Sequence, residues 1–142
     1  MISSRVQIVP FERRHLELFD LGDPELEAQV AELGRPSLWR SAFAPEGMLA
    51  IGGLVIIARG VAEVWLAPSQ LARRYPLTLT QAAGRFLDQA WERFRLHRLQ
   101  AGVLAQNRRA CRWIELLGFA REGVMRKFGP QGQDFVLYAK VR

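Results

Sequence analysis

The chain has 142 residues, 49% of them hydrophobic, and its 20 basic against 14 acidic residues give a net charge of +6. This length and this apolar content suit one domain, residues 1–142, with a core of its own, and they exclude a disordered chain. The only cysteine, Cys111, excludes a disulfide framework and a cysteine metal cluster. A lone cysteine also suits a reducing cytoplasm.

The positive charge favours an anionic partner, which could be a phosphorylated cofactor, nucleic acid or an acidic protein. A basic surface that only keeps the chain in solution is the alternative. Arg5 is followed by no apolar stretch of the kind that a secretory signal needs, and the longest apolar run, Met48 to Ala58, is too short to span a bilayer. We therefore expect a soluble, cytoplasmic protein with no membrane partner.

The first part of the chain predicts a strand, two short helices and a hairpin. Pro24 at the first helical position opens the second helix, and the hairpin turns at residues 45–47. The strand after this turn is continuously apolar, as is typical of the centre of a sheet, and Gly52 and Gly53 mark a bulge or a close backbone approach within it. The predicted segments are the strand Val6–Val9, the helices Glu12–Phe19 and Pro24–Leu33, and the strands Ser37–Ala44 and Met48–Ala58.

The middle of the chain predicts a strand, Val61 to Ala67, and then an amphipathic helix. Pro76 lies near the start of this helix. The basic residues His97 and Arg98 lie at its predicted end, which is favourable beside the helix C-terminus. The apolar stripe of the helix consists of Leu79, Ala83, Phe86, Ala90 and Phe94.

The last part predicts a strand, a helix and two further strands. Asn107 suits the N-cap of the helix and Gly118 its C-terminal stop, and a turn at 129–132 separates the two strands. The predicted segments are the strand Leu99–Leu104, the helix Ala110–Leu117, and the strands Phe119–Phe128 and Phe135–Val141. The complete order, β-α-α-β-β-β-α-β-α-β-β, predicts a mixed α/β (α+β) sandwich in which helices flank a sheet.

One dense pattern carries a family resemblance: Asn107-x-x-Ala110-x-Arg112-x-x-Glu115-x-Leu117-Gly118-Phe119-x-x-Glu122-Gly123, followed by Tyr138. It resembles the C-terminal half of the GNAT acyl-CoA N-acyltransferases, most closely the branch that acetylates protein N-termini. A weaker likeness, over Val64 to Phe119, is to the acetyltransferase-like proteins of T7-type phages, some of which are associated with virion assembly. The GNAT resemblance implies a mostly antiparallel, splayed sheet and acetyl-CoA as co-substrate.

In such a fold, the pantetheine arm of acetyl-CoA binds where two neighbouring strands part, and its pyrophosphate lies at the N-terminus of the helix that follows. The family loop there usually reads Gln/Arg-x-x-Gly-x-Gly/Ala, whereas residues 69–77 contain no glycine. Arg73 and Arg74 could compensate by contacting the phosphates directly, and the alternative is a loop that no longer binds CoA. The acetyl-CoA-binding set that the resemblance implies is Leu66, Ala67, Arg73, Arg74, Tyr75, Leu77, Asn107 and Ala110.

Glu63 is the candidate general base, because some GNAT enzymes use a glutamate on this strand to remove a proton from the acceptor ammonium, often through water. A solvated strand carboxylate is the alternative interpretation. Asn107 matches a family asparagine that bonds the pantetheine arm or an ordered water. Ile114 stands where the family often has a tyrosine as general acid, so this chain, like the N-terminal acetyltransferase branch, lacks that acid. Tyr138 or Tyr75 could substitute, but neither occupies the family position.

Two main functions and one weaker one follow. The first is an acetyl-CoA-dependent N-acetyltransferase that acts by direct attack of an amine, from a protein N-terminus or a small molecule, with a homodimer as one option for its assembly. The second is a GNAT-fold binding or assembly protein, phage- or prophage-derived, that has lost acyl transfer. The third is nucleic-acid binding through Arg108, Arg109 and Arg112, although these residues suit a solvated helix face better. His15 and His97 are too isolated for a metal site, and no metal is expected.

Overall fold

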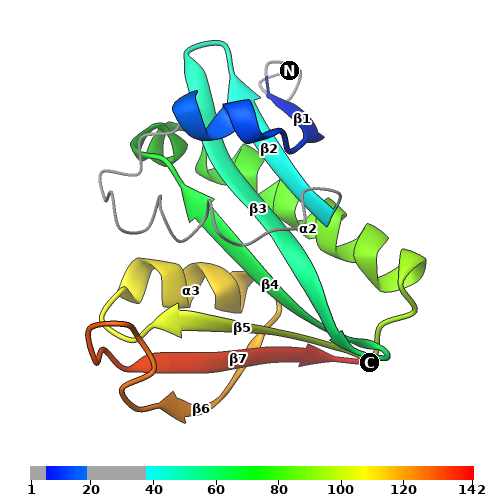
Figure 1. The fold of residues 1–142 in the computed structure, drawn as a ribbon, viewed down its shortest axis with the longest axis vertical. Coiled ribbons are helices and arrows are strands. Elements are labelled where there is room, and N and C mark those ends of the chain that lie inside the picture. The colour runs from blue at the N-terminus through cyan, green and yellow to red at the C-terminus, as the bar shows by residue number, and fades with distance from the viewer. Residues whose placement is uncertain (1–5, 19–37) are drawn as a thin grey trace. The chain divides into compact units, whose positions relative to one another are not determined.

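The computed structural model describes residues 6–18 and 38–142 (Figure 1). The strands form a seven-stranded sheet in the order β1-β2-β3-β4-β5-β7-β6. The predicted mixed fold, with a mostly antiparallel sheet and few helices, is confirmed. The helix predicted for Pro24 to Leu33 lies outside the described residues. The elements are β1 (Gln7–Pro10), the 3₁₀ helix η2 (Arg13–Leu18), β2 (Trp39–Ala44), β3 (Gly47–Ala58), β4 (Val61–Pro68), the 3₁₀ helix η4 (Gln70–Arg74), α2 (Pro76–Arg93), β5 (Arg98–Leu104), α3 (Arg108–Leu116), β6 (Ala120–Met125) and β7 (Phe135–Val141).

The chain divides into two compact units. Unit 1 comprises the described residues up to Val55 together with Trp65–Ala83, and unit 2 comprises Ile56–Val64 and Gly84–Arg142. β3, β4 and α2 each contribute residues to both units. The single domain that the sequence predicts stays a prediction. Among the described residues, no helix is both long enough and apolar enough to cross a membrane.

Unit 1 is built on an antiparallel meander, in which β1 pairs with β2 and β2 pairs with β3. Its core is aromatic: the Trp39 ring meets the Trp65 ring edge to face at 4.8 Å, and Phe11 lies 5.1 Å from Trp39. Ile51 of β3 is completely buried beneath this cluster. The first helix is a short 3₁₀ helix rather than the predicted α-helix.

Gly52 and Gly53 allow close approach rather than a bulge. A Cβ on Gly53 would lie 2.5 Å from the Cδ1 atom of Trp39 and 2.9 Å from the carbonyl oxygen of Leu38. The register irregularity of this hairpin lies instead between Ala42 and Phe43 on β2. Of the two alternatives for the glycines, the structure therefore selects the close approach, because the indole of Trp39 occupies the space that a side chain would need.

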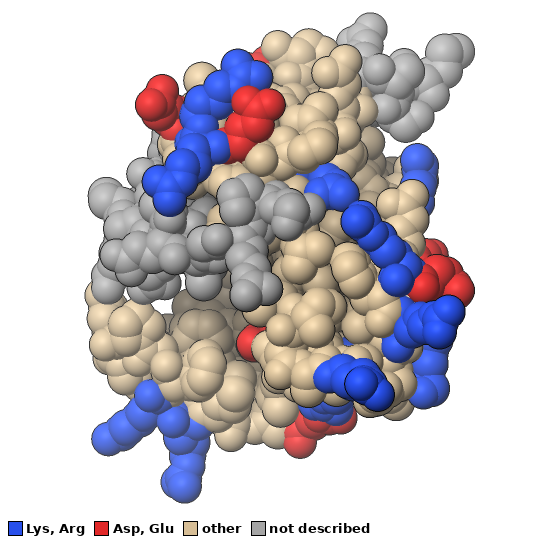
Figure 2. Space-filling view, turned by 45° about the vertical axis from the view of Figure 1, so that its right-hand side comes forward, with Lys and Arg blue, Asp and Glu red and all other residues tan. Residues whose placement is uncertain are grey.

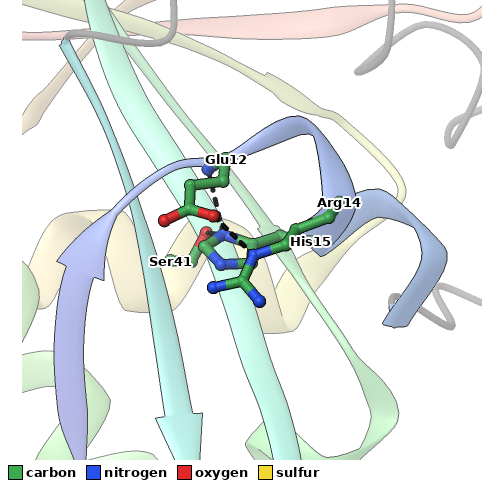
Figure 3. Close-up of polar contacts among 4 residues, drawn as sticks. All are labelled: Glu12, Arg14, His15 and Ser41. Carbon is green, nitrogen blue, oxygen red and sulfur yellow. Dashed lines mark hydrogen bonds and ion pairs between the residues drawn. The ribbon is translucent and has the colours of Figure 1, made fainter.

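A buried histidine ties η2 to β2 (Figure 3). The His15 Nδ1 atom accepts the backbone N–H of Glu12 at 3.0 Å, and the Ser41 hydroxyl oxygen lies 2.8 Å from the same nitrogen. An N–H group can only donate, so Nδ1 carries no proton and the proton of the neutral ring is on Nε2. Burial lowers the pKa of His15, and this effect exceeds the opposing influence of Glu12.

Unit 2 is centred on β5, which pairs along all seven of its residues with β7 in antiparallel register. Leu99 of β5 is fully buried, as is Trp91 of α2, whose ring also receives the guanidinium of Arg142 at 4.8 Å. The predicted apolar stripe of α2 is partly wrong. Leu87 and Trp91 are buried, whereas Phe86 and Phe94 are only half-buried, because the buried face extends to one side of the predicted stripe.

The segment after α2 also differs from the prediction. The helix ends at Arg93, so His97 and Arg98 are not at its C-terminus as predicted. Instead, the backbone N–H groups of both residues donate to the carbonyl of Gly60, and Arg98 begins β5. Gly60 adopts a φ of +75°, and a Cβ there would lie 2.2 Å from the His97 ring. The histidine therefore packs against a turn and not against a helix end.

The signals around α3 are confirmed. Asn107 caps the helix, since its side-chain oxygen accepts the N–H of Ala110 at 3.0 Å, and Gly118 follows the helix with a φ of +94°. The strand after it is shorter than predicted, because β6 ends at Met125 and Lys127 turns the chain with a φ of +55°. β7 has the predicted bounds.

The glycines provide a matched test of the close approach. We expect Gly53→Ala to lower the free energy of unfolding by about 1–3 kcal/mol, because the new methyl group must displace Trp39 or the backbone. Gly84→Ala in α2, where a Cβ would meet nothing within 4 Å, should raise it by about 0.5–1 kcal/mol. Urea unfolding of the two variants measures both changes, and equal stabilities would contradict the packing described for Gly53.

His15 should make stability depend on pH. Because burial lowers its folded-state pKa, the unfolded chain binds the proton more readily. The contribution should be fully present above the unfolded pKa of about 6.5 and should be lost as pH falls from there through the folded pKa. Urea unfolding at several pH values measures this, with His15→Gln as the control. A difference between the two proteins that stays constant across this window would rule out the titration.

Candidate active site

Glu63 is half-buried on β4, and it is the last residue of this strand that pairs with β5. The parallel ladder with β5 sets Val61 opposite Arg98 and Glu63 opposite Gln100, and the register ends there. Neighbours in register on adjacent strands direct their side chains to the same face of a sheet. Glu63 and Gln100 therefore share a face, and the strands place a carboxylate beside a carboxamide.

Arg98 links this face to β6. Its guanidinium donates twice to the Glu122 carboxylate, with N–O distances of 2.6 and 3.1 Å, and its Nε donates to the Gln100 side-chain oxygen at 3.0 Å. The hydrogen bond to Arg98 holds the pKa of Glu122 below its usual value, and the same bond raises the pKa of Arg98. The register of β6 against β7 shifts between Arg121 and Gly123, so Glu122 has no register partner on β7.

Asn107 and Ala110 are brought together at the first turn of α3. The Asn107 oxygen is occupied by the Ala110 N–H, so the structural role of the asparagine as an N-cap is confirmed. Its side-chain NH₂ group still has two hydrogens to donate. A single side chain can therefore cap the helix and also offer a donor to a ligand.

Tyr138 is poorly suited to donate a proton to a leaving group. The side chain is 2% exposed on β7, and its hydroxyl donates to Glu115 of α3 at 3.2 Å. Burial above all, and then Cys111 and Glu115, raise the pKa of Tyr138 to about 12. Ile114 is buried. The helix therefore has an apolar side chain where many GNAT enzymes have a tyrosine acid.

In unit 1, the loop without glycines is a 3₁₀ helix, η4. The N–H of Ala72 donates to Ser69, and the N–H of Tyr75 donates to Ala72, so these two amides bond within the loop. At the start of α2, Pro76 has no N–H, and helix geometry leaves those of Leu77 and Thr78 without an intrahelical acceptor. The amides that could face an anion are therefore mainly those of the first turn of α2.

The side chains around this loop fall into two kinds. Arg73 and Arg74 are exposed at the end of η4, and Leu77 is 78% exposed. The Tyr75 hydroxyl instead bonds the Glu46 carboxylate at the β2–β3 turn, at 2.7 Å. On β4, Leu66 is half-buried and Ala67 is buried in the aromatic core, so Ala67 can offer a ligand only its backbone groups.

The three arginines of α3 form an exposed group. Arg108, Arg109 and Arg112 are exposed on α3. On the face drawn in Figure 2, the Lys and Arg side chains lie in several separate places, some of them beside acidic side chains. Within the described ranges, no three His, Cys, Asp or Glu side chains are grouped so that they could hold a metal ion.

Sequence reasoning missed the network around Arg98. Arg98 was assigned to a helix end, and Gln100 was only one polar residue in an alternating strand. The one signal was Glu122, which belongs to the family pattern and whose partner the structure identifies as Arg98. By unit, the predicted site residues are Glu63, Asn107 and Ala110 in unit 2, and Leu66, Ala67, Arg73, Arg74, Tyr75 and Leu77 in unit 1.

Comparison with known proteins begins with sequence. No family model matches the chain. A curated relative, the Bacillus subtilis (strain 168) protein named probable N-acetyltransferase YjcK, is 39% identical over 49 residues, which are 34% of this chain and 27% of the relative. The chain thus spans about a quarter of the length of the curated relative it matches.

Solved structures match nearly the whole chain. An acetyltransferase of the GNAT family from Bacillus anthracis superposes with a TM-score of 0.75 at 18% identity, over 96% of this chain and 95% of that one. This chain has the GNAT acetyltransferase fold. A variant of the spermidine N-acetyltransferase SpeG from Vibrio cholerae matches the same fold with a TM-score of 0.72 at 18% identity, over 97% and 94% of the two chains. The ribosomal-protein-S5-alanine acetyltransferase of Vibrio fischeri gives 0.72 at 13% identity, over 96% and 93%.

These findings confirm the resemblance to GNAT acetyltransferases that the pattern from Asn107 to Tyr138 predicts. The weaker likeness to phage proteins stays a prediction. β4 and β5 are the parallel pair of strands in this fold, α2 connects them, and α3 follows β5.

Proposed function

We propose that this GNAT chain is an acetyl-CoA-dependent N-acetyltransferase that moves an acetyl group to an amine by direct attack. The observation that carries the proposal is the position of Glu63. It is the last β4 residue in register with β5, it is half-buried, and among the described residues no ion pair engages its carboxylate. A carboxylate of this kind can accept a proton.

Acetyl transfer from a thioester to an amine requires a general base. An alkylammonium with a pKa near 10 must lose a proton before its nitrogen can attack a thioester carbonyl. Glu63 accepts this proton, directly or through water. A C–N bond then forms, the C–S bond breaks, and coenzyme A leaves as a thiolate. The new amide nitrogen gives its second proton to water, and the thiolate takes a proton from water. No tyrosine acid is needed, because a thiolate is a fair leaving group, and this suits a site with Ile114 on α3 and a buried Tyr138.

Groups in each unit suit particular parts of the co-substrate. The free NH₂ of Asn107 suits the amide-rich pantetheine arm. The N–H groups of the first turn of α2 and the positive end of that helix suit a pyrophosphate. The exposed guanidinium groups of Arg73 and Arg74 suit phosphate oxygens. They replace the backbone N–H groups of Ala72 and Tyr75, which already donate hydrogen bonds within the loop.

The acceptor is proposed only as a class. The matched structures include a spermidine N-acetyltransferase and a ribosomal-protein-alanine acetyltransferase, both of which act on amines. We therefore infer an amine acceptor, either a small molecule or a protein N-terminus, with a homodimer as one arrangement of the enzyme. The net charge of +6 suits a co-substrate rich in phosphate.

A second candidate function is a GNAT-fold binding or assembly protein without acyl transfer. The observation that favours it is η4, in which the amides of Ala72 and Tyr75 already have acceptors within the loop. If Arg73 and Arg74 do not compensate, the loop lacks the contacts that phosphates need. Calorimetry with acetyl-CoA separates the two candidates, because only the enzyme must bind it.

Glu63→Gln tests the enzyme. The two side chains have the same shape, so acetyl-CoA affinity and thermal stability should be nearly unchanged, while transfer at neutral pH should fall by roughly 10²–10⁴-fold. Raising the pH should make the two rates converge, because the amine is then already deprotonated. Steady-state kinetics from neutral to alkaline pH measures this.

The control for Glu63→Gln is Glu17→Gln, which changes an exposed carboxylate on η2 and should leave the rate unchanged. A Glu63→Gln enzyme as fast as the wild type at neutral pH, with chemistry shown to be rate-limiting, would make Glu63 a structural carboxylate. Wild-type protein that binds no acetyl-CoA would refute the enzyme and leave the binding protein.

Arg73→Ala with Arg74→Ala tests the compensation. Acetyl-CoA binding should weaken by about 1.5–3 kcal/mol for each charged hydrogen bond lost. Arg121→Ala with Arg126→Ala removes the same charge from exposed residues elsewhere and should weaken binding far less. Isothermal calorimetry compares the two double variants. Equal dissociation constants would mean that the arginines act only through net charge.

A further inference from the structure

We propose that Glu46, in the turn between β2 and β3, is a positioning residue for the groups of η4 and α2 that bind phosphate, and that Tyr75 transmits its effect instead of contacting acetyl-CoA. This inference rests on the proposed function, because it concerns the loop that we infer to hold the phosphates. All the residues that carry it belong to unit 1.

The residue before η4 is tied to β3. The N–H of Ser69 donates to the carbonyl of Leu49 at 2.7 Å, and its hydroxyl donates to the carbonyl of Met48, also at 2.7 Å. Ser69 is buried, and hydrogen bonds are electrostatically stronger in such surroundings than in water. The chain that enters η4 is therefore bound to residues that directly follow the β2–β3 turn.

The residue after η4 is tied to the turn itself. The Tyr75 hydroxyl donates to the Glu46 carboxylate, with distances of 2.7 Å to Oε1 and 2.5 Å to Oε2. A hydrogen bond to an ionised acceptor is about twice as strong as one between neutral groups. A Cβ on Gly47 would lie 3.8 Å from the Leu71 Cδ2 atom, so a side chain of η4 also lies over this turn. The contacts of Ser69 and Tyr75 thus form a clamp, through which one hairpin holds both ends of η4.

Tyr75 is also the joint between η4 and α2. Its N–H donates to the carbonyl of Ala72, and its own carbonyl accepts the N–H of Leu79 in α2, both at 3.0 Å. Arg73 and Arg74 immediately precede it. A hydrogen bond that anchors the Tyr75 side chain therefore restrains the backbone of the two arginines and also the first turn of α2.

The charge of Glu46 requires an indirect role. A carboxylate repels a phosphate, so Glu46 can favour phosphate binding only by holding other groups in place. Ordering a loop when a ligand binds costs conformational entropy, and a loop that is already held avoids part of this cost. The side chains of Arg73 and Arg74 still rotate, so the clamp orders the backbone from which they extend and the amides at the start of α2.

The first test needs neither a ligand nor activity. In Tyr75→Phe, which removes only the hydroxyl, the amide protons of Tyr75 and Leu79 should exchange with solvent about 3- to 10-fold faster, because the joint opens more easily. Amide exchange followed by NMR measures this. The Cys111 amide, which bonds within unit 2, is the internal reference and should not change. Equal exchange rates in the wild type and the variant would overturn the clamp.

The second test uses the sign of a change in affinity. Glu46→Ala should weaken acetyl-CoA binding by about 3- to 10-fold, because the loop loses its anchor. Charge alone predicts the opposite, since removing a carboxylate favours a ligand rich in phosphate. Glu46→Gln keeps an acceptor oxygen and should bind within about twofold of the wild type. Glu17→Ala removes an exposed carboxylate on η2 and should not weaken binding. Isothermal calorimetry compares the four proteins, and equal or tighter binding by Glu46→Ala would overturn the proposal.

The third test asks whether the effect is confined to the phosphates. Tyr75→Phe should weaken binding of acetyl-CoA but leave that of S-acetylpantetheine, which has no phosphate, within about twofold. In the background of Arg73→Ala with Arg74→Ala, the same change should have a much smaller further effect, because part of what the clamp positions is already gone. An equal loss of affinity for both ligands would show general damage to the fold and overturn the positioning.

The outcomes separate this proposal from the proposed function. Wild-type protein that binds no acetyl-CoA would refute the enzyme, and the exchange rates of Tyr75 and Leu79 would still decide whether the clamp holds η4. A wild type that binds acetyl-CoA, with the same affinity in Glu46→Ala and Tyr75→Phe, would support the enzyme and overturn the positioning. If Glu46→Ala does not fold, Tyr75→Phe breaks the same hydrogen bond by a smaller change and decides the question.

Discussion

The parallel ladder between β4 and β5 is the constraint on which the candidate site depends. It is only three residue pairs long, from Val61–Arg98 to Glu63–Gln100, whereas β5 pairs with β7 along its whole length. The strong ladder fixes β5, and the short one then fixes where Glu63 sits against it. A shift of one residue would turn Glu63 to the other face and place Ala62 or Val64 beside Gln100.

The two faces of β5 differ in burial and polarity. Leu99 and Ala101 are buried, while Arg98 and Gln100 are half-buried and polar. The buried residues contribute the apolar burial that stabilises the unit, and the polar ones form a network that reaches Glu122 on β6. Period-two alternation therefore lets one strand contribute both to the core and to a polar network on its other face.

The loop without glycines in unit 1 shows a different arrangement. A glycine-rich loop would bring backbone amides to the phosphates, whereas here the chain closes into η4 and satisfies two of those amides internally. What remains is the start of α2 and a pair of exposed arginines. Charged side chains can replace amides as donors to phosphate, but they are less rigid, so the proposed phosphate binding would depend more on charge than on preorganisation.

The sequence by itself determined the features that depend on neighbouring residues. Asn107 caps α3, Gly118 ends it, and the segment Phe135–Val141 alternates as the strand that it is. The family pattern around these residues led to the GNAT fold, and that resemblance made Glu63 and the arginine pair candidates, because the predicted strand and loop matched the family's. The conformation of the loop, a 3₁₀ helix without glycine, was not predicted.

Only the tertiary structure decided which residues far apart in the chain meet. It joined Arg98 to Glu122, set His15 against Ser41, and filled the space above Gly53 with the indole of Trp39. It also buried Trp91 instead of Phe86 on α2, because neighbouring elements, and not the helix period, choose the centre of a buried face. Such pairings are set by strand register and packing, which no short-range pattern encodes.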